Sequence, residues 1–171
     1  MSEDEFEMLA TYLDDHRAGA AAGRSLSRRM ARENSDTGWA ERLAGLAEDI
    51  EADDRTLGEL RRVLGIRGGV AKRALARFAA GAARLKLNRR IVGYSALSRV
   101  LEAEAMMAGV VAKKCLWAVM RSRGGIGDQT AQFDFVSLET RARDQITLLT
   151  EYHEAAAKAA FTGAHGGAIR G

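Results

Sequence analysis

Proline is absent from all 171 residues of the chain, so no helix is interrupted by a residue that lacks a backbone N–H. Cys115 is the single cysteine, which excludes a disulfide within the chain. Aromatic residues make up only 6% of the sequence, whereas Ala and Leu are abundant and β-branched residues are scattered. This composition favours helices over strands, and we expect an all-α protein.

Long apolar runs are also missing. No stretch of the chain approaches the roughly 20 apolar residues that cross a bilayer as a helix, so we expect no transmembrane segment. The N-terminal sequence MSEDEFEM is acidic, where a secretory signal has basic and then apolar residues. The sequence therefore predicts a cytoplasmic protein.

Four long segments have apolar residues at the spacing of an amphipathic helix: Asp4 to Glu33, Trp39 to Leu64, Ala96 to Arg123 and Ala131 to Phe161. Gly65 is a stop signal for the second segment, and Ser95 is a suitable N-cap for the third. We expect residues 1–162 to form a single helical-bundle domain. The tail at 163–171 is expected to be disordered.

A shorter amphipathic segment, at about 68–87, connects the second and third long helices. From Leu60 to Leu101 the chain has eleven Lys or Arg residues and no acidic residue. The candidates for an anion-binding surface are Arg67, Lys72, Arg73, Arg77, Arg84, Lys86, Arg89 and Arg90. Residues 67–90 thus suit an anionic membrane surface, a nucleic acid or an acidic protein. The alternative is that this segment packs its apolar side on the bundle and leaves its charges solvated.

Two helical hairpins joined by a connection of about 30 residues suit a four-helix bundle with one long crossover. The helix lengths, this crossover and the acidic or His residues on inner faces resemble the ferritin-like superfamily, especially its uncharacterised bacterial members. The resemblance covers residues 4–161. It implies an antiparallel four-helix bundle with a partly helical crossover between helices 2 and 3. The di-metal motif Glu-x-x-His is degraded, because Ile50 precedes Asp53 and Thr150 precedes His153 at the Glu position.

Five ionisable side chains fall on the predicted inner faces, as metal ligands or as members of a polar core: His16, Asp53, Glu104, Glu139 and His153. Antiparallel pairing of the first two helices places His16 opposite Asp53. Glu104 lies in the middle of an apolar arc and is expected to be buried, whereas Glu102 is expected to face solvent. Cys115 is expected to be an inert core residue.

These inner residues have two interpretations. In the first, they form a metal-free network with waters, in which each carboxylate pairs with His, Arg24 or Arg143. In the second, some of them hold iron or manganese. The small residues Gly19 to Gly23 beside His16 are likewise open to two interpretations. They allow a neighbouring helix to approach closely, or they leave room for a small molecule.

We therefore predict a ferritin-like bundle that acts as a non-catalytic binding or scaffold module without a cofactor, engaging a protein partner or a second copy of itself. The alternative is an iron- or manganese-binding redox or storage protein. A further alternative is peripheral binding of an anionic membrane or a nucleic acid through residues 67–90. No residue is predicted to be catalytic.

Overall fold

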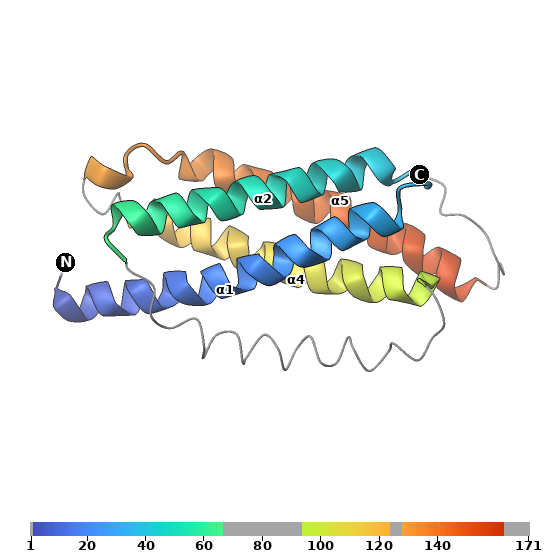
Figure 1. The fold of residues 1–171 in the computed structure, drawn as a ribbon, viewed down its shortest axis with the longest axis horizontal. Helices are drawn as coiled ribbons and strands as arrows, with labels where there is room; N and C mark the ends of the chain where they lie inside the picture. The colour runs from blue at the N-terminus through green and yellow to red at the C-terminus, as the bar shows by residue number, and fades with distance from the viewer. Residues whose placement is uncertain (1, 67–93, 124–127, 163–171) are drawn as a thin grey trace.

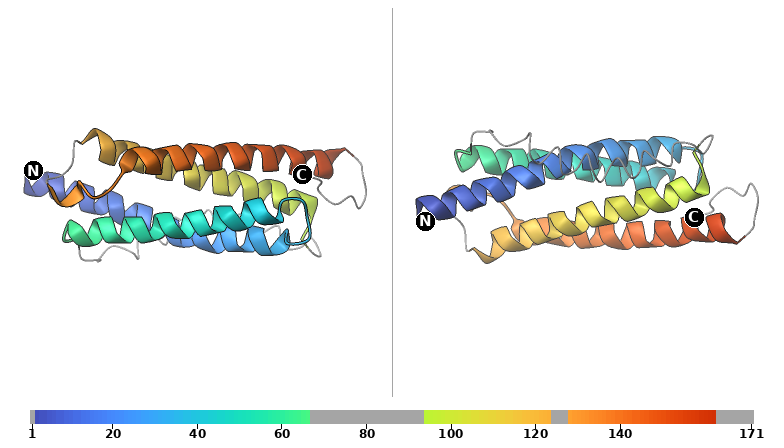
Figure 2. Two further views of the ribbon diagram at one scale, coloured as in Figure 1. Left: turned by 90° about the horizontal axis from the view of Figure 1, so that it is seen from above. Right: turned by 90° about the horizontal axis from the view of Figure 1, so that it is seen from below.

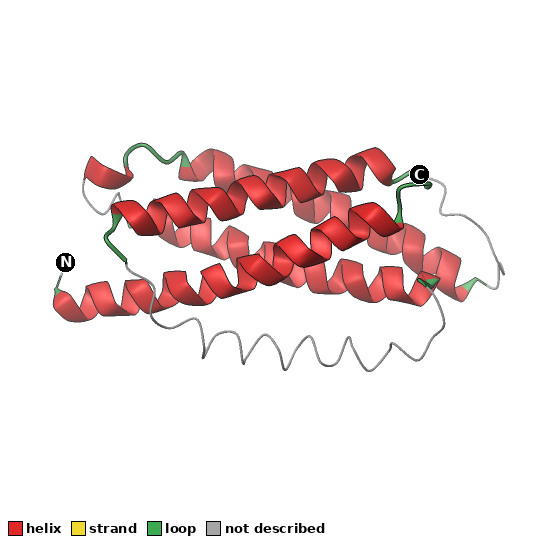
Figure 3. Ribbon diagram, in the orientation of Figure 1, coloured by secondary structure: helices red, strands yellow, loops and turns green. Residues whose placement is uncertain are grey.

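The computed structural model describes residues 2–66, 94–123 and 128–162, and this part of the chain is helical without strands (Figure 3). Its elements are α1 (Glu3–Glu33), α2 (Ala40–Val63), α4 (Ala96–Ser122), the short 3-10 helix η2 (Asp128–Thr130) and α5 (Phe135–Phe161). The prediction of an all-α protein is confirmed. Within the described ranges no helix combines the length and the apolarity needed to cross a membrane. The predicted crossover helix at 68–87 and the tail at 163–171 lie outside the described residues.

The helix ends follow local sequence signals. Ser2 caps α1, because its Oγ accepts from Glu5 N at 3.2 Å while Ser2 N donates to the Glu5 carboxylate at 2.7 Å. Ser95 caps α4, as predicted, and accepts from Ser98 N at 3.1 Å. After α2, Gly65 has a φ of 71°, a left-handed conformation that glycine adopts without the steric cost of a Cβ atom.

The fourth long helix begins later than predicted. Ala131 is not its first turn, because η2 ends at Thr130 and α5 starts only at Phe135. Asp134 sets this start, since its Oδ1 accepts from Ser137 N at 3.0 Å. An N-cap carboxylate satisfies a backbone N–H that would otherwise lack an acceptor, and it outweighs the helix propensity of the preceding residues.

The four long helices form two antiparallel hairpins that pack side by side. α1 packs mainly on α2 and α4 mainly on α5, while α1 also contacts α4 and α2 contacts α5. Figure 2 shows the α2–α5 side from above and the α1–α4 side from below. Neighbouring helices run in opposite directions, and α2 ends at the end of the bundle opposite to the one where α4 begins (Figure 1).

The apolar core consists of two clusters of buried residues. The first contains Met30 and Trp39 near the α1–α2 turn, together with Ile50 and Val110. The second contains Leu9, Leu13, Leu57, Leu60, Leu116, Trp117 and Phe135, near the opposite end of the bundle. The candidate site lies where these two clusters meet.

Candidate functional site

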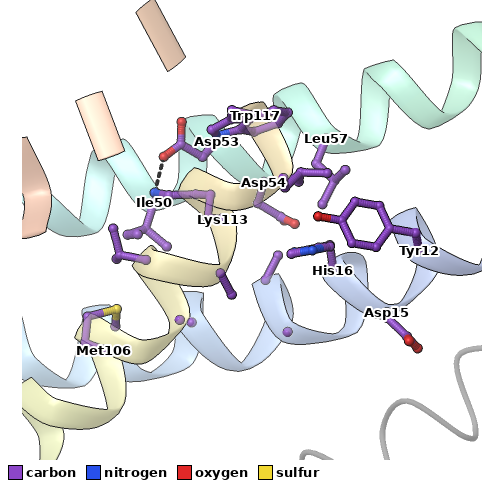
Figure 4. Close-up of a pocket in the computed structure, with 17 residues that line it drawn as sticks. Tyr12, Asp15, His16, Ile50, Asp53, Asp54, Leu57, Met106, Lys113 and Trp117 are labelled. Atoms are coloured by element: carbon purple, nitrogen blue, oxygen red, sulfur yellow. Dashed lines mark hydrogen bonds and ion pairs between the residues drawn. The ribbon is translucent and has the colours of Figure 1, made fainter. Parts of the chain in front are cut away.

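A cavity of about 320 Å³ lies between α1, α2 and α4 (Figure 4). Small residues of α1 and α4 border it: Gly19, Ala20, Gly23, Gly109 and Ala112. A Cβ atom on Gly23 would lie 3.9 Å from Ile50 Cγ2, and one on Gly109 would have no heavy atom within 4 Å. A side chain at Gly23 would thus meet α2 at ordinary van der Waals distance, so the approach of the two helices does not require glycine there. The alternative expectation, a pocket, describes these positions.

The cavity occupies the level at which the two apolar clusters meet. On α2, Asp53 lies between Ile50 of the first cluster and Leu57 of the second. On α4, Lys113 lies between Val110 of the first cluster and Leu116 of the second. All of these residues line the cavity. Its wall thus combines apolar side chains from both clusters with charged groups in between.

Tyr12 and His16 form one wall of the cavity. Their ring centroids are 4.6 Å apart, and the ring planes meet edge to face at 74°. Burial lowers the pKa of His16, partly opposed by the nearby Asp15 carboxylate, so the imidazole is neutral at neutral pH. Burial likewise raises the pKa of Tyr12. Within the described ranges, neither the His16 ring nitrogens nor the Tyr12 hydroxyl has a hydrogen-bond partner.

The Asp54 carboxylate points into the same space, as Figure 4 shows. Its charge is compensated from α1, where Arg17 and Arg24 both form ion pairs with it, the Arg24 Nε to Oδ2 distance being 3.0 Å. Arg17 also donates to the Asp54 backbone oxygen at 3.3 Å. Asp54 is only 4% exposed, and these two cations stabilise its ionised form in the interior.

Asp53 is held on the other side of the cavity by residues of α4 and α5. Lys113 and Arg141 form ion pairs with its two oxygens, and Lys113 Nζ also donates to Gln145 Oε1 at 2.5 Å. Burial lowers the pKa of Lys113, an effect that Asp53 opposes. This arrangement differs from the prediction that His16 and Asp53 pair. Both line the cavity, but no hydrogen bond joins them in the described part of the chain, because the longer Lys113 and Arg141 reach Asp53 from neighbouring helices.

The Trp117 indole also lines the cavity. The residue is fully buried and stacks on Phe135 with the ring centroids 6.3 Å apart. Its Nε1–H has no hydrogen-bond acceptor among the residues described. A buried donor without an acceptor costs free energy, and such groups in a native structure often mark a place for water or a ligand.

The remaining predicted inner residues are distributed over separate sites. Glu139 is buried, as expected, and pairs with Arg143 and with Arg121 Nε at 3.0 Å. Glu104 and His153 contact each other, with Nε2 to Oε1 at 3.2 Å, but the Glu104 side chain is 53% exposed. The structure thus pairs two of the five candidates and leaves the others apart.

The prediction that Glu104 is buried and Glu102 is solvated is wrong. Glu102 is 3% exposed and accepts from Tyr94 at 2.9 Å, and its pKa is raised by burial. The reason is that α4 has apolar residues on two sides, so its apolar pattern does not specify one inward face. Its buried stripe is Val100, Ala103, Met106, Val110, Trp117 and Met120, while an exposed stripe contains Ala108, Val111, Ala112, Cys115 and Val119.

Cys115 is therefore an exposed thiol, and its expected place in the core is wrong. Residues 2–66, 94–123 and 128–162 contain no group of three His, Cys, Asp or Glu side chains placed to hold a metal ion. The basic candidates at 67–90 lie outside the described residues.

A polar cluster at one end of the bundle was not predicted. Asn34, fully buried just after α1, donates to Met30 O at 2.8 Å and to the Tyr94 hydroxyl at 3.1 Å. Its Oδ1 accepts from Arg99 Nε at 3.0 Å and from the Tyr152 hydroxyl at 3.2 Å. Asn34 has the sequence context of an ordinary turn residue, and its partners Tyr94, Arg99 and Tyr152 are 60 or more residues away in the chain.

Comparisons with known proteins found no match for this chain among family models, curated proteins or solved structures. The proposals below therefore depend on the geometry of the described residues and on the sequence.

Proposed function

We propose that this protein is a non-catalytic helical-bundle binding protein that takes up a small, mostly apolar molecule in the cavity between α1, α2 and α4. The observation that carries this proposal is a space of about 320 Å³ between α1, α2 and α4, open to solvent beside Gly109 and Ala112. Ligand sites of drug-sized molecules occupy roughly 300–1,000 Å³ and have mostly apolar walls with a few polar groups. The cavity is at the lower end of that range and fits a molecule of one or two rings.

The state of the charged wall residues supports binding over catalysis. Asp53, Asp54 and Lys113 are each held in ion pairs with other protein groups, whereas Asp15 has no ion pair with a described residue. A general acid or base needs to exchange a proton with its substrate, and a nucleophile needs a free lone pair. Groups that already neutralise one another serve instead to fix the shape of the cavity.

The finer architecture belongs to the same proposal. The two antiparallel hairpins, and the placement of the end of α2 and the start of α4 at opposite ends of the bundle, support a ferritin-like arrangement with a long crossover. The iron or manganese alternative has no comparable support, because no three of the five residues considered for it are placed to hold one metal ion.

The experiment that tests the proposal is titration of the protein with prodan, an uncharged fluorophore of two fused rings whose emission shifts to the blue in apolar surroundings. Gly23→Leu is expected to abolish the shift, since its new side chain starts 3.9 Å from Ile50 and fills the cavity. The matched control is Gly45→Leu, a change to a glycine in the first half of α2 that also has open space around it but does not line the cavity.

Prodan binding that Gly45→Leu retains and Gly23→Leu loses supports the proposal. Binding that survives in both variants places the probe elsewhere, and no binding by the unchanged protein contradicts the proposal. Gly109→Leu is a second cavity-filling change, with no heavy atom within 4 Å of its Cβ position, and it serves if Gly23→Leu does not fold.

A further inference from the structure

The polar groups of the cavity wall fall into two classes. Asp53 and Asp54 each have two cationic partners, so their charges are compensated inside the protein. Tyr12 and His16, by contrast, have no hydrogen-bond partner in the described part of the chain, and neither does the buried Nε1–H of Trp117. Apart from the Asp15 carboxylate, the groups left for a ligand are therefore uncharged donors and acceptors.

These free groups are not spread evenly over the wall. Figure 4 shows the Tyr12 hydroxyl and the His16 ring pointing into one side of the cavity, next to the Asp54 carboxylate, while Ile50 and Met106 lie on the other side. The cavity thus has a polar side and an apolar side. A ligand that matches it has an apolar body and one polar group at its end.

The wall also indicates the charge of that polar group. A charged group transferred into such a site loses its hydration and needs a free counter-ion in return. Lys113 is engaged with Asp53 and Gln145, and Arg17 and Arg24 are engaged with Asp54. Asp15 also lines the cavity, half-buried beside His16, and its carboxylate forms no ion pair with a described residue. A cationic ligand is therefore the alternative that the experiment has to test.

From these observations we infer that the cavity selects an uncharged molecule with a flat, apolar body and one hydroxyl group, which exchanges hydrogen bonds with Tyr12 and His16. This inference rests on the proposed small-molecule function. A hydroxyl group donates one hydrogen bond and accepts others, so it can serve one nitrogen of a neutral imidazole and the Tyr12 hydroxyl together. The apolar part of the lining, which includes Ile50, Leu57 and Met106, receives the body of the ligand.

The test compares four molecules with the same two-ring body by isothermal titration calorimetry: naphthalene, 2-naphthol, 2-naphthoate and 2-naphthylmethylamine, the last being cationic at neutral pH. We expect 2-naphthol to bind roughly tenfold more tightly than naphthalene, the upper end of what the net contribution of one hydrogen bond implies. The two charged molecules are expected to bind more weakly than naphthalene. Gly23→Leu should remove all binding.

Variants of the free polar groups assign the selectivity to them. His16→Phe keeps a flat ring but loses both nitrogens, so the advantage of 2-naphthol over naphthalene should fall from about tenfold to about two- or threefold. Tyr12→Phe removes a single oxygen atom and gives a second measurement if His16→Phe does not fold. The matched control is His153→Phe, which changes a histidine outside the cavity and should leave the advantage unchanged.

Equal affinities of naphthalene and 2-naphthol, with binding still lost in Gly23→Leu, would overturn the selectivity and leave the proposed function intact. Tighter binding of 2-naphthylmethylamine, or of 2-naphthoate, would overturn it in the same way and assign the polar side to a charged ligand. No binding by any of the four, together with no prodan binding, would overturn the proposed function itself.

Discussion

The ion pair between Asp53 and Lys113 can be separated from the predicted contact between Asp53 and His16 by two double-mutant cycles. The changes are Asp53→Leu, Lys113→Met and His16→Leu, made singly and in the two pairs that contain Asp53→Leu. Each removes a polar group and keeps an apolar side chain of similar size, so the loss of packing is small in comparison with the loss of polar contacts.

The expected magnitudes follow from burial. The Asp53 and Lys113 side chains are 3% and 14% exposed. Asp53→Leu leaves the Lys113 ammonium without its counter-ion, and breaking a buried pair in this way costs about 3–5 kcal/mol. We expect the lower value, about 3 kcal/mol, because the burial that lowers the pKa of Lys113 also makes its neutral form accessible. Lys113→Met should cost about 2 kcal/mol, since Asp53 keeps Arg141 and Gln145.

The double variant Asp53→Leu, Lys113→Met removes the stranded charge along with its partner. Its loss should be about 2–3 kcal/mol instead of the roughly 5 kcal/mol sum of the single losses, which corresponds to a coupling energy of about 2–3 kcal/mol. Asp53 and His16 share no hydrogen bond, so their cycle should be additive within about 0.5 kcal/mol.

Free energies of unfolding from urea titrations, followed by far-UV circular dichroism at neutral pH, measure both cycles. Additivity for Asp53 with Lys113, together with coupling for Asp53 with His16, would refute the arrangement of this layer and support the pairing predicted from the sequence. An unchanged denaturant slope in all variants is the control that the unfolding transition remains comparable.

Three further experiments test other parts of the structure. Glu102→Leu should destabilise the protein by about 2 kcal/mol, because it removes the acceptor of Tyr94 and the partner of Arg29. Glu104→Leu, at an exposed position, should change the free energy of unfolding by at most about 0.5 kcal/mol. Similar losses for both variants would contradict the assigned face of α4. Cys115, being exposed, should react fully with a maleimide in the folded protein, and protection until unfolding would contradict its exposure. Burial lowers the pKa of His16 below its usual 6.5, so His16 binds a proton in the unfolded chain at a higher pH than in the folded protein. The free energy of unfolding should therefore decrease as the pH drops through about 6.5, and the decrease should end below the pKa of His16 in the folded protein. His16→Phe should reduce this slope, and an unchanged slope would contradict the burial of the imidazole.

Much of the fold could be predicted because its signals are local. The ends of α1, α2 and α4 depend on Ser2, Gly65 and Ser95 and on the residues next to them, and the pairing of α1 with α2 follows from a short turn and matching apolar positions. The inward face of α4 could not be predicted, because Ala, Val and Cys residues form a second apolar stripe that the structure leaves exposed.

Of the predicted inner residues, His16 and Asp53 line the cavity and Glu104, Glu139 and His153 do not, while Tyr12, Asp54 and Lys113 were not predicted. His16 and the Gly19 to Gly23 segment gave the position of the cavity, since a histidine and small residues interrupt an apolar face. The partner of Asp53 was missed because Lys113 is long, and its charged end reaches a layer that its position on the helix does not indicate. The same reasoning that selected Glu104, a charged residue within an apolar stretch, also applies to Lys113 between Val110 and Leu116.

The Asn34 cluster has a consequence for the order of folding. The helices of each hairpin are neighbours in the sequence and contact each other extensively. The α1–α2 hairpin and the α4–α5 hairpin can therefore each form from contacts that are local in the chain. Asn34, however, obtains Tyr94, Arg99 and Tyr152 only from the other hairpin, and until the hairpins dock its amide remains hydrated. The hydrogen bonds of the Asn34 cluster therefore form only when the two hairpins dock. Asn34→Ala should accelerate unfolding while leaving the folding rate nearly unchanged, as expected for contacts that form after the transition state.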